Sequence, residues 1–259
     1  MCADFTSIVE EEDMTFQIGF STPEGVLLAS DLKNVNLGGF RWGISAPKIK
    51  VHESENLAYC SAGDDFCNVF TETIREEIRK DALRFVQGEV EDAIMQCVYA
   101  AREKESVFCG KHTPQSPRRV VPTCIGGTTM LVFRRNGTVT LWTVETSRVV
   151  PTIMPVSIDW ALAGDSGNPA AYFPHRYFDK LPKTPASLIP LAVHTISMAK
   201  NDNVEGVQIG VFSKDRFGLL TDQELKPYIA LSDEIDSDIL KRLQPAPENG
   251  ADTRTEEHS

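Results

Sequence analysis

One threonine near the start of the sequence, Thr15, stands where it could act as a nucleophile. After it, Phe16, Ile18 and Phe20 alternate with polar or small residues, which is the period of a half-buried strand. As the first residue of a processed chain, Thr15 would carry a hydroxyl and a free amine on adjacent carbon atoms. That pairing is a nucleophile with its own base. The sequence therefore raises the hypothesis of an N-terminal threonine nucleophile.

The residues around Thr15 predict how it is presented. Residues 1–14 contain four consecutive acidic residues, a charge cluster typical of a solvated and poorly ordered leader. After the first strand, Pro23-Glu24-Gly25 predicts a turn, and residues 26–31 form a second apolar run. Thr15 is therefore expected to open a β-hairpin. Two further antiparallel strands are predicted at 47–51 and 57–63.

Helical and strand patterns then alternate in blocks. An amphipathic helix is predicted from Asp64 onward and a second one over 87–103, because apolar residues recur there at helical spacing. The turn at Asn136-Gly137 predicts a hairpin between residues 128 and 144. Later elements are predicted as one or two strands over 149–163, helices 172–178 and 187–200, hairpin 206–220 and helix 232–243. This order predicts an α+β fold, an antiparallel sandwich with helices on each outer face.

A set of short motifs occurs in a fixed order between residues 15 and 225. They are Thr15, Gly19, Glu24-Gly25-Val26, Asp31, Lys48-Ile49, Ala62-Gly63-Asp64, Asp165-Ser166-Gly167, Asp202 and Gly206. Together these motifs resemble those of proteasome β-type subunits, the family that includes the bacterial protease HslV. This resemblance implies the four-layer α-β-β-α sandwich of N-terminal nucleophile hydrolases, in which two antiparallel sheets lie between helix pairs.

The resemblance also implies a mechanism centred on Thr15. Its Oγ1 would attack a peptide carbonyl, and its own α-amine, with an ordinary pKa of roughly 7.7 to 8.0, would accept the proton through water. Lys48 would be the nearby cation, lowering the pKa of the amine or of the hydroxyl. Asp31 would hold the Lys48 ammonium by a charge-assisted hydrogen bond.

Three more site positions follow from the same resemblance. Ser166 and Asp202 are expected to orient the amine, and a backbone N–H near Cys60 to form the oxyanion hole. The chain departs from the family pattern at Glu205, where a serine is usual, at Cys60, where glycine is common, and at Met14, where self-processed subunits carry glycine. If translation begins at Met14, removal of the initiator methionine exposes the threonine without autolysis.

The resemblance therefore predicts a cytoplasmic threonine-type endopeptidase acting on unfolded polypeptides inside a self-compartmentalised assembly. The expected assembly is a homo-oligomeric double ring, to which a ring-shaped ATPase could deliver substrates. Residues 1–14 are interpreted as a leader or propeptide, or as untranslated if synthesis begins at Met14. Residues 15–244 are interpreted as the peptidase domain, and 245–259, rich in Pro, Glu, Thr and Gly, as a disordered tail.

Two alternatives stay open at this point. A non-catalytic ring subunit of the same fold, serving assembly or gating, would retain the leader. The segment Gly164–Pro169 also resembles the nucleophile segment of chymotrypsin-like serine proteases, with Ser166 as nucleophile. That interpretation is disfavoured, because those enzymes are two β-barrels with few helices and neither His52 nor His112 lies in the A-A-H-C setting.

Composition excludes several other classes. The formal charge of −11 and the pI near 5.0 argue against a nucleic-acid binder. Six cysteines without C-x-x-C spacing and the absence of a secretory signal predict a reducing, cytoplasmic setting. The apolar stretch 185–199 is too interrupted for a membrane span. The histidines show no paired metal spacing, and no phosphate-binding loop appears, so we expect no metal or cofactor.

Overall fold

The computed structural model describes residues 15–34, 44–45, 47–85, 89–112, 126–164, 166–199 and 206–243. The predicted leader and the predicted tail lie outside these residues, and so do Asp165, Asp202 and Glu205. Interpretation of 1–14 as a leader and of 245–259 as a tail therefore stays a prediction.

The strand that follows Thr15 lies near the middle of a five-stranded antiparallel sheet. This first sheet has the order β10-β1-β2-β11-β12. Its strands are β1 (Phe16–Thr22), β2 (Gly25–Ser30), β10 (Trp160–Gly164), β11 (Gln208–Ser213) and β12 (Phe217–Leu219). The β1–β2 hairpin pairs Gln17 with Ser30 and Thr22 with Gly25, so the hairpin predicted from the sequence is confirmed.

A second antiparallel sheet of five strands has the order β5-β6-β7-β8-β9. Its strands are β5 (Lys50–His52), β6 (Leu57–Gly63), β7 (Gly127–Arg135), β8 (Thr138–Glu145) and β9 (Thr152–Val156). Asn136 and Gly137 join β7 to β8 with φ angles of 51° and 78°, the positive values for which an Asn-Gly turn is suited. A separate two-stranded ladder joins β3 (Lys33–Asn34) to β4 (Ile44–Ser45).

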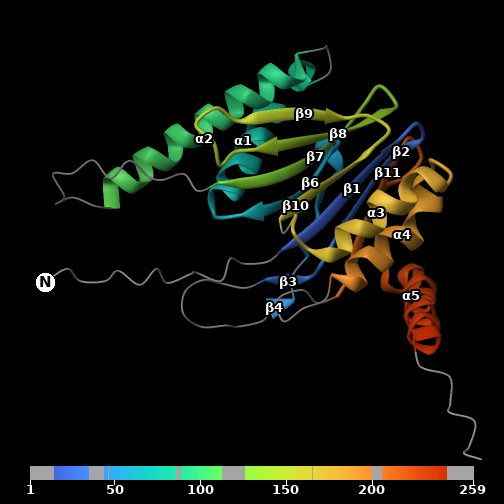
Figure 1. Cartoon of the computed structure of the whole chain (residues 1–259). Coiled ribbons are helices and arrows are strands. Elements are labelled where there is room, and N and C mark those ends of the chain that lie inside the picture. Colours follow the sequence, from blue (N-terminus) through green and yellow to red (C-terminus); the bar gives the residue numbers. More distant parts are fainter. Residues whose placement is uncertain are drawn as a thin grey trace, which may run out of the picture.

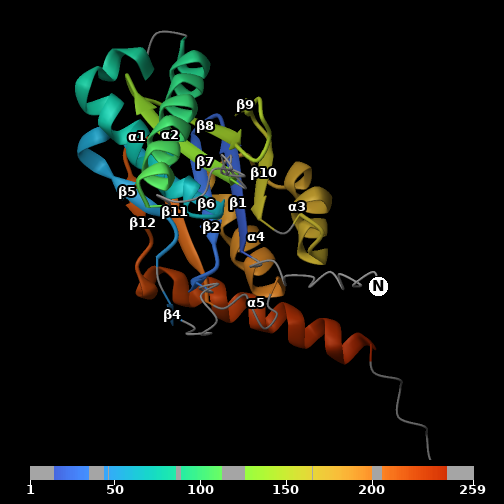
Figure 2. The same ribbon diagram turned by 90° about the vertical axis from the view of Figure 1, so that its left-hand side faces the viewer.

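Helices cover the outer face of each sheet (Figures 1 and 2). On the second sheet these are α1 (Phe66–Lys80) and α2 (Val90–His112), with the 3-10 turns η1 (Glu53–Glu55) and η2 (Ala82–Phe85) beside them. On the first sheet they are α3 (Tyr172–Tyr177) and α4 (Pro185–Met198), flanked by the short turns η3 (Pro169–Ala171) and η4 (Phe178–Lys180). The last helix, α5 (Asp222–Leu243), packs against α4 and extends beyond the body of the molecule. No helix in the described ranges has the length and apolar character that a membrane span requires.

The apolar side chains form three clusters that correspond to the gaps between layers. Phe16, Ile18 and Phe20 point from β1 toward α3 and α4. The opposite face of β1 turns toward the second sheet. Between the two sheets, Leu28 of β2 is buried against Met130 of β7 and Leu141 of β8. A third cluster lies between the second sheet and the pair α1 and α2. The protein is therefore a four-layer α-β-β-α sandwich, as predicted.

The start of α5 differs from the prediction, which placed the helix at 232–243. The helix begins ten residues earlier because Thr221 and Glu224 form a capping box. The Glu224 backbone N–H donates to Thr221 Oγ1 (3.3 Å), and the Thr221 backbone N–H donates to Glu224 Oε2 (2.8 Å). The T-x-x-E pattern was visible in the sequence and could have located this start.

Close backbone contacts between β6 and β7 make a testable prediction about glycine. An alanine Cβ at Gly127 would lie 2.1 Å from the Ala62 carbonyl oxygen, a backbone atom that cannot turn away. We expect Gly127→Ala to lower the free energy of unfolding by about 3 kcal/mol or more. Gly218→Ala is the matched control, since no atom lies within 4 Å of the point where its methyl group would stand, and the change should be nearly neutral. Urea unfolding followed by tryptophan fluorescence compares the two; equal losses would contradict this account.

Packing of α4 against α5 buries His194, whose Nδ1 lies 2.9 Å from Ser232 Oγ. Burial lowers the pKa of this imidazole below its ordinary 6.5, against a weaker opposing effect of Asp236. The folded state therefore favours the neutral ring. Its contribution to stability is complete above about pH 6.5 and is lost as the pH falls from 6.5 toward the lower folded pKa.

We expect wild-type protein to lose more stability between pH 7.5 and pH 5 than His194→Gln, which keeps a polar side chain without this titration. Urea midpoints measured at both pH values for both proteins provide the test. The other titrating groups contribute equally to both proteins. Subtracting the change measured for His194→Gln from the change measured for wild type therefore leaves the contribution of His194. An identical pH dependence in the two proteins would refute the role assigned to His194.

Candidate active site

Three of the predicted site residues meet at the start of β1. Thr15 immediately precedes this strand, Asp31 follows the last residue of β2, and Lys48 lies two residues before β5. Lys48 Nζ donates hydrogen bonds to Thr15 Oγ1 (3.1 Å) and to Asp31 Oδ2 (2.6 Å). The Asp31 side chain is fully buried and the Lys48 side chain is 6% exposed. The structure thus places an ammonium group against the threonine hydroxyl.

The Asp31 carboxylate is positioned by the β1–β2 hairpin itself. Its Oδ1 accepts from the Phe16 backbone N–H (3.2 Å), while the Asp31 N–H donates to the Phe16 carbonyl (3.3 Å). One carboxylate oxygen therefore binds the backbone beside Thr15, and the other binds Lys48. This double attachment aligns the charged pair with the first residue of the strand.

The backbone that carries Lys48 is held by a residue distant in sequence. The buried Gln208 of β11 accepts hydrogen bonds at Oε1 from the backbone N–H groups of Lys48 (3.0 Å) and Ile49 (2.8 Å). Sequence reasoning did not identify Gln208. A polar residue in an otherwise apolar strand was the available signal, and it did not indicate which backbone the side chain would reach.

Gln17 is a second polar residue that sequence reasoning missed. It follows Thr15 by two positions, so both side chains lie on the face of β1 that turns toward the second sheet. Gln17 is completely buried, and its Nε2 donates to the Ser61 carbonyl (3.1 Å) on β6. Gln17 therefore ties the strand of the candidate nucleophile to the edge of β6.

Backbone direction along β6 decides which N–H groups face this site. The Arg134 N–H donates to Asn56 O (3.0 Å), and the Asp64 N–H donates to Gly126 O (3.4 Å). In an antiparallel pair these directions alternate, so even-numbered β6 residues point their N–H groups toward β7. Cys60, in register with Met130, is one of them, and Ser61 instead faces the opposite edge. The Cys60 thiol is buried between the sheets, which raises its pKa above the ordinary value.

Ser166 comes to the same end of the sandwich as Thr15. It lies in an exposed turn two residues after Gly164, which is paired with Phe16. Gly164 has a φ of 93° and packs so tightly on the Thr15 carbonyl that a Cβ there would lie 1.7 Å from the oxygen. Within the described parts of the chain, no hydrogen bond joins Ser166 to Thr15. Asp202 and Glu205 lie outside the described residues, so their roles stay predictions.

The arrangement suits activation of a hydroxyl nucleophile. A cation 3.1 Å from Thr15 Oγ1 stabilises negative charge that develops on this oxygen. Among the residues that the structure describes, no cluster of three or more His, Cys, Asp or Glu side chains is arranged to hold a metal ion.

Comparison with known proteins gives a fold likeness only. No protein-family model and no curated protein sequence matches the chain. Among solved structures, Anbu (ancestral β-subunit) from Yersinia bercovieri matches with a TM-score of 0.57 and 11% identity, over 91% of this chain and 100% of that one. Anbu from Hyphomicrobium sp. strain MC1 matches with a TM-score of 0.60 and 10% identity, over 90% and 99%. At such low identity, the likeness establishes the sandwich fold.

These matches correct the family resemblance drawn from the sequence. The solved structures described above as similar to the chain are Anbu proteins. The sequence-based interpretation named a different relative, a proteasome β-type or HslV-like subunit, and is therefore wrong. A threonine-led strand, an acid after the next strand and a lysine beyond it describe one end of the shared sandwich.

The buried Asp31–Lys48 pair makes a prediction about stability. In Asp31→Asn, the Lys48 ammonium loses its counter-charge while remaining almost fully buried. We expect the free energy of unfolding to fall by about 3–5 kcal/mol, the usual consequence of removing one partner of a buried ion pair. Urea unfolding measures the change. As a control, Asp238→Asn removes an exposed ion pair with Lys241 and should leave stability almost unchanged. Similar values for both variants would show that the Asp31–Lys48 pair is not effectively buried.

Proposed function

We propose that this protein is a threonine-type peptidase whose nucleophile is Thr15 Oγ1, exposed as the first residue once 1–14 are absent. The observation that carries the proposal is the contact of Lys48 Nζ with Thr15 Oγ1 at 3.1 Å, with Asp31 as the counter-charge. A threonine with a purely structural role in a strand does not require a buried ammonium group beside its hydroxyl. Here that group lies against the one hydroxyl that processing would place beside a free amine.

The proposed reaction begins with proton transfer from the Thr15 hydroxyl to its own α-amine through a water molecule. Oγ1 then attacks the carbonyl carbon of the scissile peptide bond, and the Lys48 ammonium stabilises the charge on the attacking oxygen. The protonated amine returns its proton to the leaving amine. An ester between Thr15 and the acyl group results, and water hydrolyses it by the reverse sequence. With Met14 attached, the Thr15 nitrogen is an amide and cannot act as the base.

We assign the oxyanion donor to the Ser61 N–H in place of the N–H of Cys60. The backbone of Ser61 faces the β6 edge on the Lys48 side, beyond the last β5 pair at Tyr59. Gln17 holds the carbonyl of the same residue through its Nε2. A preorganised N–H at this edge is suited to the negative charge of a tetrahedral intermediate.

The wider proposal is that residues 15–244 form the peptidase domain of a cytoplasmic, homo-oligomeric double ring that degrades unfolded polypeptides. A ring-shaped ATPase is the proposed source of those substrates. Likeness of the fold to Anbu, called an ancestral β-subunit, supports an assembled state. Ser166 and Asp202 keep their proposed roles in orienting the amine. A non-catalytic ring subunit is the second candidate, and the acidic segment before Met14 is the feature that favours it.

We expect a chain expressed from Met14 to lose its initiator methionine, which intact-mass measurement verifies, and to hydrolyse fluorogenic peptides. Thr15→Ala should lower the rate by about a thousandfold or more, whereas Thr15→Ser should retain part of it. Ser166→Ala serves as the control for a serine mechanism. Hydrolysis that survives Thr15→Ala and disappears with Ser166→Ala would refute the threonine mechanism. A correctly processed, assembled and inert wild-type chain would favour the non-catalytic subunit.

A further inference from the structure

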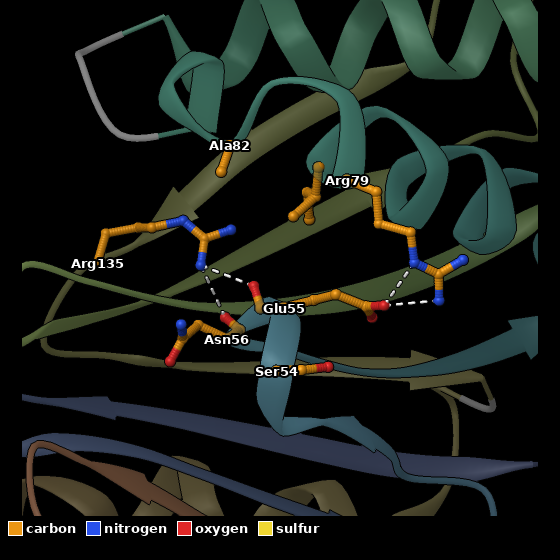
Figure 3. A pocket seen from close by; sticks show the side chains of 7 residues that line it. Ser54, Glu55, Asn56, Arg79, Ala82 and Arg135 are labelled. Atoms are coloured by element: carbon orange, nitrogen blue, oxygen red, sulfur yellow. Dashed lines mark hydrogen bonds and ion pairs between the residues drawn. The ribbon is translucent and has the colours of Figure 1, made fainter.

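A pocket with a volume of about 380 Å³ lies at the end of β6 remote from Ser61 (Figure 3). It is bounded by η1, the C-terminal end of α1, the start of η2 and the end of β7. Its polar lining residues are Ser54, Glu55, Asn56, Arg79 and Arg135. The proposed peptidase mechanism uses none of these residues, so this pocket is separate from the candidate active site.

Arg135 is fixed at one wall of this pocket by the Asn136-Gly137 turn that follows it. Its Nη1 donates to three carbonyl oxygens, those of Glu55 (2.8 Å), Asn56 (3.3 Å) and Arg134 (3.0 Å). Its Nε and Nη2 are buried and have no hydrogen-bond partner among the described residues. Nε–H and Nη2–H point in parallel along one edge of the guanidinium plane, the edge that binds two oxygens of one anion.

The acid in the pocket is already engaged by other cations. Glu55 Oε1 lies 2.6 Å from Arg79 Nη2, and Glu55 Oε2 lies 3.1 Å from Arg75 Nε. The nearby His52 has a pKa lowered chiefly by burial, so at neutral pH it adds no charge. Arg75, Arg79 and Arg135 therefore outnumber the acids that contact them, Glu55 and Glu72. Among the residues that line the pocket, the formal charges are one acid, Glu55, and two cations, Arg79 and Arg135.

A structural role explains the hydrogen bonds of Arg135 Nη1 but not the buried Nε and Nη2 atoms. Its Nη1 satisfies carbonyl groups at the end of η1, where Asn56 adopts a left-handed conformation with φ 52°. A lysine ammonium could satisfy the same carbonyls. The empty edge is different, because two charged donors removed from water without partners are destabilising. Something with paired oxygen atoms would compensate for that loss.

We propose that this pocket is a binding site for a small oxyanion, a carboxylate or a phosphate, held by Nε and Nη2 of Arg135. Two oxygens of the anion accept the parallel N–H groups after a small rotation of the guanidinium toward the pocket. Ser54 and Arg79 also line the pocket, and the Arg79 guanidinium is turned toward the Glu55 carboxylate. The proposal is independent of the peptidase function, since it involves a different end of β6.

Thermal unfolding in sodium phosphate, sodium acetate and sodium chloride at equal ionic strength tests the site. We expect phosphate or acetate to raise the Tm of wild-type protein by about 3 °C more than chloride does, with a saturating concentration dependence. The phosphate and acetate arms distinguish which oxyanion fits. Arg135→Lys keeps the charge and the donors for the carbonyls but lacks the parallel edge. Its Tm should therefore lose the saturating part of the response and keep only the general, non-saturating stabilisation that phosphate gives to folded proteins.

Arg84→Lys is the matched control, because Arg84 lies on η2 beside the pocket, bonded to Gln96 and Glu77, and does not line the cavity. This variant should keep the full oxyanion response. Wild-type crystals grown with tungstate provide a second measurement that needs no variant, and should show the anion against Nε and Nη2 of Arg135. A wild-type Tm indifferent to the choice of anion, an undiminished response in Arg135→Lys, or tungstate absent from the pocket would each overturn the proposal.

Discussion

A buried ion pair between Lys48 and Asp31 connects the two sheets of this protein. Lys48 leads into the first strand of the second sheet, and Asp31 ends the hairpin of the first. Either charge alone would be strongly destabilising in the interior, where desolvation of an ion is expensive. The two segments must therefore stay together at this end of the sandwich. Because the ammonium also reaches Thr15 Oγ1, the same constraint that joins the sheets defines the surroundings of the candidate nucleophile.

Glycines allow the backbone around Thr15 to come unusually close. Gly164 contacts the Thr15 carbonyl, and Gly127 contacts the Ala62 carbonyl on β6, at distances that leave no room for a Cβ atom. Gln17 and Gln208 then attach their neighbouring backbone segments by side-chain hydrogen bonds across the sandwich. Thr15, Asp31 and Lys48 therefore lie within two residues of strand ends that these contacts hold in place, an arrangement that favours precise positioning of side chains.

The buried cations near the two ends of β6 differ in their hydrogen-bond partners. At one end, the Lys48 ammonium is paired with a buried carboxylate. At the other, Arg135 binds backbone carbonyls through Nη1 and leaves the edge formed by Nε and Nη2 without a partner among the described residues. This edge is the one to which we assign the proposed oxyanion, because a charged donor buried without an acceptor is destabilising.

Periodicity was sufficient to predict most of the fold. Alternation after Thr15, helical spacing from Phe66 and the Asn136-Gly137 turn each depend on neighbours in the chain, and all three elements form as predicted. The boundaries of two helices differ from the prediction. The start assigned to α5 was late, because the Thr221–Glu224 capping box was overlooked, and the helix predicted over 87–103 continues as α2 to His112. Motif spacing likewise placed Thr15, Asp31 and Lys48 in one hypothesis. It did not identify the solved structures that the fold resembles, which are Anbu proteins at 10–11% identity.

Local sequence determined most elements of this protein and brought Thr15, Asp31 and Lys48 forward as candidate site residues. Tertiary structure alone decided which backbone each polar side chain reaches. Gln208 meets Lys48 across 160 residues, and Gln17 meets Ser61 across 44. The direction of the Ser61 N–H and the empty edge of Arg135 were also beyond sequence reasoning. The physical reason is that hydrogen bonding depends on distance and direction between segments, and packing of the two sheets sets both.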